Sequence, residues 1–466
     1  MQKLPVTARH LKGCPCIRCT IDQLSKAYLR VIHTMNTNQP GHGGCSKGGF
    51  AVRLLQFELK KLWTSGLFKT LLVVFFLSIA CYFVYAYMNA VRVPDVALEI
   101  RDQIRQNELQ MEEQPESEEG EPSEEALFWQ EYNQKLEDQL RAYETGDWTT
   151  VLQMEIDKIQ PDLDTLIVSR QYYTSSFPTL FTTETRRALF QYMQEHGVTP
   201  ILPVDLYAWR TLYDLNFPVD GASDDDFLKD FVTEHSALDS SAGIYFLKQV
   251  TDLLFGLAGL LFFLLLFSDI VTKEGIGANG PIHLLQTQPI WRPLILLSKF
   301  VTVLLVSTAV LLGTALFSLG LGAGFDKLGD WNYPVLVYGE TYAHDFMPIG
   351  VYLAKTAALF FFGLLFVTAL LFFFSYVTKR AIAALVLTAA VILLGIQLSN
   401  QVAGLAFAPY VPFAYLASPY IVTMQTAAIW EDFRFTFPLG LLVLGGASAV
   451  LLAAAYLVSG LQRKRA

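Results

Sequence analysis

Four cysteines near the start of the chain are the first residues whose types could do chemistry, as ligands of a metal ion. Cys14, Cys16 and Cys19 lie close together, and Cys45 follows alone. A structural zinc site usually joins two close pairs of ligands, so this spacing argues against one. The acidic run SDDDF, which begins at Ser223, lacks the spaced oxygen ligands and final glutamate of a calcium hand. The histidines share no ligand spacing either, so we expect no metal site.

Motifs for catalysis and nucleotide binding are also missing. The chain has no G-x-x-x-x-G-K-[ST] phosphate loop, no H-E-x-x-H zinc motif and no G-x-S-x-G elbow. It has no pair of intramembrane carboxylates of the kind that a proton-driven carrier uses. We therefore expect no catalytic residues, no cofactor bound by this chain and no enzyme activity of its own.

The elements that position any functional residue are apolar runs. Of the 466 residues, 53% are hydrophobic. A helix needs roughly 20 mostly apolar residues to cross a bilayer. Six runs reach about this length, at 69–88, 250–270, 300–321, 349–377, 381–398 and 438–459. None has a charge at its centre, and charges near the ends, such as Lys69 and Asp252, can extend toward the headgroups. We predict an all-α membrane protein with six transmembrane helices.

The distribution of charge predicts how these helices are oriented. Lysine and arginine gather in the segments that are cytosolic if the N-terminus is inside, whereas the short outer loops carry only Lys327 and Arg434. We therefore expect a multi-pass protein of the cell membrane with both termini in the cytosol. Residues 91–247 contain 32 acidic and 11 basic side chains, which predicts an acidic extracellular domain. The remainder carries a net charge of +12, which suits the anionic lipids of the inner leaflet and requires no nucleic acid partner.

The first 51 residues match no signal peptide, because no apolar stretch precedes the first span. The Lys-Gly-Gly sequence before Val52 can be encoded by a purine-rich ribosome-binding site, and valine can be encoded by a GTG start codon. We expect 1–51 to be an untranslated or disordered leader. An amphipathic interfacial helix then occupies 52–68, and the first span occupies 69–90. The expected apolar stripe of the interfacial helix consists of Leu54, Leu55, Leu59, Leu62 and Trp63.

Helical periodicity predicts a mostly helical extracellular domain at 91–247. Helical patterns at 96–111 and 126–144 flank an acidic loop rich in proline and glycine. A further helix, TTETRRALFQYMQEHG, has Thr183 as its expected N-cap and Gly197 just past its end.

Residues 248–466 hold the second to sixth spans and one apolar segment that prolines interrupt. This segment, 401–432, is too broken to span, so we expect an extracellular re-entrant segment there. Its large aromatic residues suit the headgroup level: Tyr410, Tyr415, Tyr420 and Trp430.

The cytosolic loop at 271–299 has its own internal pattern. Glycines and Pro281 end the helix of the second span, 282–288 is long enough for a short separate helix, and Pro289 ends it. Arg292 and Lys299 then flank the start of the third span, where they can reach inner-leaflet phosphates. On spacing alone, a loop that merely turns the chain remains an open alternative.

This loop resembles the intracellular signature of the type-2 ABC transporter (exporter) permease family. In that family a charged residue and a glycine precede a pair of leucines, a TQP-like turn, an arginine and a lysine. The matching positions are Glu274, Gly275, Gly280, Leu284, Leu285, Thr287, Gln288, Pro289, Ile290, Arg292 and Lys299. The family's usual Gly-Thr or Gly-Ser is Gly280-Pro281 here, although proline suits a first helical position.

The resemblance implies a function and partners. The short helix would be a coupling helix that docks into a groove on a separate ABC ATPase subunit, which holds ATP and Mg. Leu284 and Leu285 would make the apolar contact, and Glu274 and Arg292 would hold the angle of the loop. Transport by alternating access requires a second permease, either an identical copy or a paired chain. The resemblance thus implies the permease subunit of a bacterial ABC exporter. The alternative is an ABC-coupled membrane sensor or assembly protein whose outer domain binds a ligand without transport.

Overall fold

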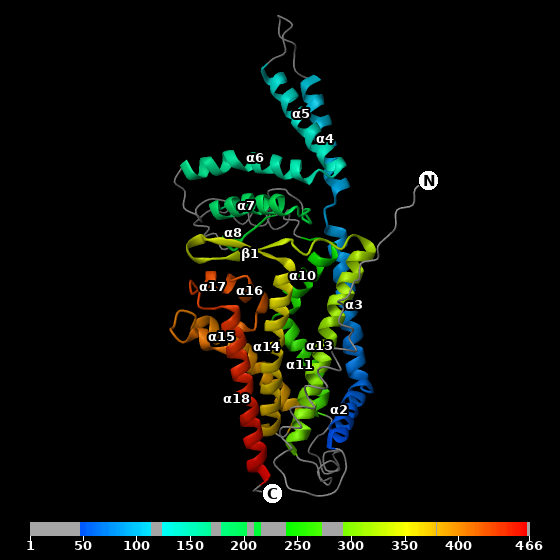
Figure 1. The fold of residues 1–466 in the computed structure, drawn as a ribbon, viewed down its shortest axis with the longest axis vertical. Helices are drawn as coiled ribbons and strands as arrows, with labels where there is room; N and C mark the ends of the chain where they lie inside the picture. Colours follow the sequence, from blue (N-terminus) through cyan, green and yellow to red (C-terminus); the bar gives the residue numbers. More distant parts are fainter. Residues whose placement is uncertain are drawn as a thin grey trace, which may run out of the picture.

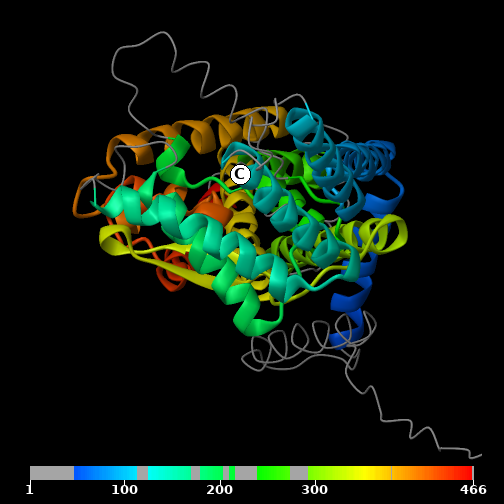
Figure 2. The same ribbon diagram turned by 90° about the horizontal axis from the view of Figure 1, so that it is seen from above.

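The computed structural model describes residues 47–112, 124–168, 179–202, 209–215, 239–272, 292–378 and 380–463. Most of the described chain is helical. Figure 1 shows a long bundle of helices with a stack of further helices at one end, which we call the bundle and the head. Helix α2 (Lys47–Trp63) and the C-terminal end of α18 (Phe437–Arg463) lie at the opposite end of the bundle, which we call the α2 end (Figure 1). Seen from above in Figure 2, the helices of the head lie over those of the bundle.

Within the described residues, the bundle contains five long apolar helices, the amphipathic α2 and the shorter α10 and α11. They are α2 (Lys47–Trp63), α3 (Gly66–Asn89), α10 (Gly243–Leu254), α11 (Leu257–Thr272), α13 (Arg292–Phe325), α14 (Ile349–Thr378), α15 (Ala381–Gln401) and α18 (Phe437–Arg463). Within the described residues, five stretches are long and apolar enough to cross a membrane, and α10 with α11 form a sixth if the bent pair is one span. The helices are those of a multi-pass membrane protein.

The expected second span, 250–270, is bent rather than straight. Helices α10 and α11 meet at an angle of 74°. A Cβ atom on Gly259 would lie 1.9 Å from the carbonyl oxygen of Leu254, so the bend requires glycine at this position. The carbonyl oxygen of Phe255 at the break accepts a hydrogen bond from the Ser418 backbone N–H at 3.2 Å. The bend is stabilised by a partner distant in sequence, which apolar length alone could not reveal.

The head consists of α4 (Val93–Glu112), α5 (Glu124–Thr145), α6 (Trp148–Val168), α7 (Leu180–His196) and the short α8 (Leu212–Leu215). Helices α4 and α5 project away from the bundle, whereas α6 and α7 lie across its axis (Figure 1). A buried ion pair between Arg186 and Glu155, 3.1 Å apart, joins α7 to α6.

The ends of α7 test the predicted caps. Gly197 has left-handed backbone geometry at the C-terminal end, as expected. The N-cap is Thr179, and the prediction of Thr183 is wrong. The reason is tertiary: Asp214, in α8, accepts hydrogen bonds from the backbone N–H and the hydroxyl of Thr179 at 3.0 and 2.9 Å.

A short β-hairpin accompanies the helices of a mostly helical structure, which is consistent with the predicted all-α membrane protein. Strands β1 (Pro334–Tyr338) and β2 (His344–Pro348) pair antiparallel in the connection between α13 and α14. The hairpin lies between the head and the bundle (Figure 1). The Tyr338 hydroxyl accepts a hydrogen bond from the Leu212 backbone N–H of the head at 2.9 Å. The Tyr338 backbone N–H donates to the Thr423 carbonyl of the bundle at 3.0 Å, so one strand holds both parts.

The segment between α15 and α18 folds into short helices rather than a span. They are η3 (Ala408–Tyr410), η4 (Pro412–Tyr415), α16 (Ser418–Val422) and α17 (Gln425–Ile429). Two glycines seat them against the long helices: Gly395 of α15 lies under the Phe413 ring and Gly440 of α18 under the Tyr415 ring. Tyr415, expected at the headgroup level, is fully buried, and its hydroxyl donates to the Pro409 carbonyl at 2.8 Å.

Candidate functional site

The predicted coupling residues fall mostly outside the described part of the chain. Arg292 is the first residue of α13. The others lie outside the described residues: Glu274, Gly275, Gly280, Leu284, Leu285, Thr287, Gln288 and Pro289. The helices that flank the loop are described, since α11 ends at Thr272 and α13 begins at Arg292, both toward the α2 end (Figure 1).

A buried ion pair holds α2 against α13 beside the ends of this loop. The Lys299 Nζ lies 3.1 Å from a carboxylate oxygen of Glu58, and the two side chains are 8% and 1% exposed. The expectation that Lys299 reaches lipid phosphates is therefore wrong, because its ammonium faces a carboxylate inside the protein. Glu58 lies on the buried face of α2 between Leu54 and Leu62, at helical spacing, where a search for apolar residues does not single it out.

The residues of the stripe predicted for α2 differ in their burial within the protein. Leu54, Leu55 and Leu62 are buried, but Trp63 is 67% exposed. Trp63 follows Leu54 by nine residues, which is two and a half helical turns, so it points away from the face that Leu54 occupies.

Helix α13 connects the α2 end to the head. Its 34 residues correspond to a length of about 51 Å at about 1.5 Å per residue. Near its far end it crosses α10 so closely that a Cβ atom on Gly322 would lie 2.1 Å from the Gly243 Cα atom. The backbone N–H groups of Gly243 and Ile244 donate to the carbonyls of Lys327 and Leu328, both at 2.9 Å. Helix α13 is thus fixed to α2 at one end and to α10 at the other.

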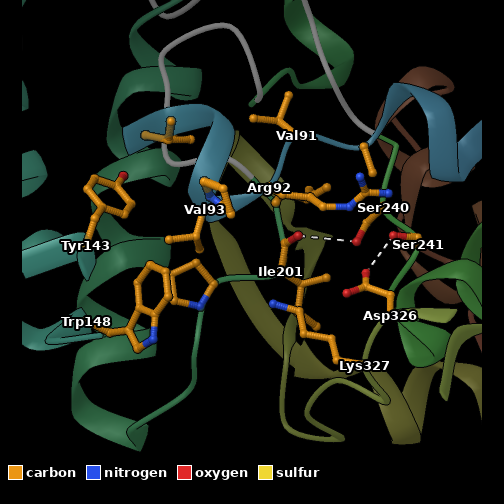
Figure 3. Close-up of a pocket in the computed structure, with 15 residues that line it drawn as sticks. Val91, Arg92, Val93, Tyr143, Trp148, Ile201, Ser240, Ser241, Asp326 and Lys327 are labelled. Atoms are coloured by element: carbon orange, nitrogen blue, oxygen red, sulfur yellow. Dashed lines mark hydrogen bonds between the residues drawn. The ribbon is translucent and has the colours of Figure 1, made fainter. Parts of the chain in front are cut away.

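A cleft lies where the head meets the bundle (Figure 3). Its volume is about 230 Å³. One wall contains residues that adjoin the ends of α3, α10 and α13, and the other contains residues of the head. The lining residues include Val91, Arg92, Val93, Tyr143, Trp148, Ile201, Ser240, Ser241, Asp326 and Lys327. The Ser241 hydroxyl donates to the Asp326 carboxylate at 2.6 Å, and the Ser240 hydroxyl donates to the Ile201 carbonyl at 3.3 Å.

A second polar cluster lies along α10. The Lys248 ammonium is 2.7 Å from the Asp252 carboxylate, which also accepts a hydrogen bond from the buried Tyr352 hydroxyl of α14. Asp252 is therefore held by two protein partners rather than extending freely to the headgroups. Nearby, Gln249 donates to Asp239 at 3.0 Å, and burial raises the pKa of the Asp239 carboxyl. This cluster fixes the first half of the bent pair against α14.

In the part of the chain that the structure describes, no three histidine, cysteine, aspartate or glutamate side chains form a group that could hold a metal ion. The cysteine of this part, Cys81, is a free thiol on the surface of α3. The site residues missed from sequence are those of the cleft, because they come from five separate segments and only folding brings them together.

Comparisons with protein-family models, with curated proteins and with solved structures find no match to this chain.

Proposed function

We propose that this chain is the permease subunit of an ABC exporter, which moves a substrate outward across the cell membrane with energy from separate ATPase subunits. The observation that supports this most is the continuous α13. It begins directly after the predicted coupling loop and reaches the junction with the head, and it is held at both ends. A displacement of the loop can therefore be transmitted along α13, as one continuous helix, to the opposite side of the membrane.

The buried ion pair gives this path its mechanical basis. With Glu58 and Lys299 in contact, α2 and the first turns of α13 move as one body. Their movement passes along α13 to the Gly322–Gly243 crossing and so to α10, the first half of the bent pair. Transport by alternating access requires the transporter to change between two conformations. ATP can drive this change only if it binds one conformation more tightly than the other, and that difference in affinity arises in the ATPase.

The proposal includes partners. ATP and Mg bind to the ATPase subunits, which dock at the α2 end through Leu284 and Leu285. A second permease, identical or paired, completes the pathway. In this arrangement the α2 end is cytosolic, which agrees with the basic residues near it, such as Lys60 and Lys61 of α2.

Copurification with an ATPase encoded beside this chain tests the proposal. We expect the double variant Leu284→Asp and Leu285→Asp to lose most of the bound ATPase, because two carboxylates would be placed in an apolar groove. The matched control is Leu98→Asp with Leu109→Asp, two exposed leucines of α4 in the head. If the first pair of substitutions leaves association and ATP hydrolysis at the level of the control, the assignment of the coupling helix is wrong.

A further inference from the structure

The cleft between the head and the bundle lies where the membrane helices end. Helix α3 ends at Asn89, α10 begins at Gly243 and α13 ends at Phe325. Cleft residues adjoin each of these ends, namely Ala90 to Arg92, Ser241, Asp326 and Lys327. The ends of membrane-spanning helices lie at the depth of the lipid headgroups. The cleft therefore faces the headgroup layer on the side of the head.

The cations of the cleft are available to a ligand. One guanidinium N–H of Arg92 donates to the Tyr87 carbonyl at 2.9 Å, and the guanidinium also lies over the Tyr87 ring, 4.0 Å from its centroid. A guanidinium has five N–H donors, so the contact with Tyr87 orients it and leaves donors for an anion. Lys327 is exposed, and within the described residues no ion pair holds its ammonium. Both cations come from the bundle side of the cleft.

The rest of the lining contains one carboxylate and, across the cleft, two aromatic side chains. Asp326 is hydrogen-bonded by Ser241 and so presents a fixed carboxylate beside the two cations. Opposite them in Figure 3 lie Tyr143 and Trp148 of the head. Tyrosine and tryptophan are the residues that favour the membrane interface, because their rings tolerate both water and hydrocarbon.

The size of the cleft limits what it holds. Its volume of about 230 Å³ is below the roughly 300–1,000 Å³ of clefts that enclose a drug-sized ligand. A headgroup fits this space, whereas the whole of a larger cargo does not. We propose that the cleft binds the phosphate-bearing headgroup of a phospholipid from the leaflet on the side of the head, with the phosphate on Arg92 and Lys327.

A bound headgroup would touch both parts of the protein. Arg92 and Lys327 belong to the bundle side, whereas Trp148 and Tyr143 belong to the head. The lipid would therefore act as a bridge that steadies the head over the bundle. The inference concerns this cleft alone and holds whichever function the bundle performs.

Lipid binding to the purified full-length protein in detergent, measured by native mass spectrometry, tests the site. The probes are dioctanoyl phosphatidylglycerol, dioctanoyl phosphatidylethanolamine and dioctanoylglycerol, which lacks the phosphate. We expect the phospholipids to bind and the double variant Arg92→Gln with Lys327→Gln to bind them at least about tenfold more weakly, since charge-assisted contacts to phosphate are lost. The matched control is Arg101→Gln with Lys135→Gln, two exposed cations of the head outside the cleft.

Three outcomes would overturn the proposal. The first is equal phospholipid binding by the cleft variant and the control variant. The second is binding of dioctanoylglycerol as tight as that of the phospholipids. The third is displacement of the phospholipid by an equal concentration of inorganic phosphate, which would assign the site to a soluble anion.

A second measurement keeps Arg92 and Lys327 in place, so it tests the site even if the double variant fails to fold. The wild-type protein and Trp148→Phe are placed in nanodiscs that contain phosphatidylethanolamine with a nitroxide on its headgroup. We expect the nitroxide to quench a larger fraction of tryptophan fluorescence in the wild type than in Trp148→Phe, because Trp148 lines the cleft. Equal quenching in the two proteins would overturn the proposal.

Discussion

At the scale of single residues, we expect substitution of Glu58 to have a large effect on the stability of the protein. Its carboxylate is buried against Lys299, and each charge makes the burial of the other tolerable. Removing one member of a buried pair typically costs about 3–5 kcal/mol, whereas replacing both by apolar side chains is often neutral. We therefore expect Glu58→Leu and Lys299→Met each to lower the free energy of unfolding by about that amount, and the double variant to recover much of the loss.

Thermal unfolding in detergent, followed by circular dichroism, measures these differences. Lys60→Met is the matched control, since Lys60 is exposed on the same helix and a surface charge contributes little. Equal midpoints for Glu58→Leu and Lys60→Met would contradict the interpretation of the pair. So would a double variant whose loss is the sum of the two single losses.

At the scale of elements, the α10–α13 crossing depends on glycine. Small residues let membrane helices approach closely, and a methyl group on Gly322 would overlap the Gly243 backbone. We expect Gly322→Ala to destabilise the bundle by about 1–3 kcal/mol, the usual range for overpacking. Gly320→Ala is the matched control on the same helix, because a Cβ atom there meets nothing within 4 Å.

The midpoints of thermal unfolding of Gly322→Ala and Gly320→Ala test whether the crossing requires glycine. Alanine favours a helix over glycine by up to about 1 kcal/mol, so Gly320→Ala is expected to unfold at the same or a slightly higher temperature than the wild type. A Gly322→Ala protein as stable as Gly320→Ala would show that the two helices can separate without cost.

The elements also show what sequence can and cannot predict here. Apolar length locates α3, α13, α14, α15 and α18, because burial in hydrocarbon leaves a strong local signal. The bend at Phe255 and the N-cap at Thr179 escape prediction, since Ser418 and Asp214 stabilise them from far along the chain. The hairpin escaped because strands of five residues leave a weak signal between long helices. The cleft is assembled from five segments, so no local pattern marks it.

At the scale of the whole molecule, the proposed function requires the head outside the cell and the α2 end inside. Cysteines introduced at Gln153 of α6 and Gln56 of α2 test this, since both positions are exposed. All native cysteines are first replaced by serine. We expect a membrane-impermeant maleimide to label Gln153→Cys in intact cells and Gln56→Cys only after permeabilisation, because the basic α2 end belongs in the cytosol. Labelling in the reverse order would place the head in the cytosol and exclude the proposed export function.

The pairing of Glu58 with Lys299 also has a consequence for how the protein is made. Glu58 is synthesised before the first span, whereas Lys299 follows only after the head and the bent pair. A nascent chain therefore carries a glutamate whose final partner does not yet exist, and α2 can dock only late in synthesis. A chain cut short before α13 never gains that partner. Until α13 is made, Glu58 lacks the cation that makes its burial tolerable, so α2 gains its full packing only once α13 is in place.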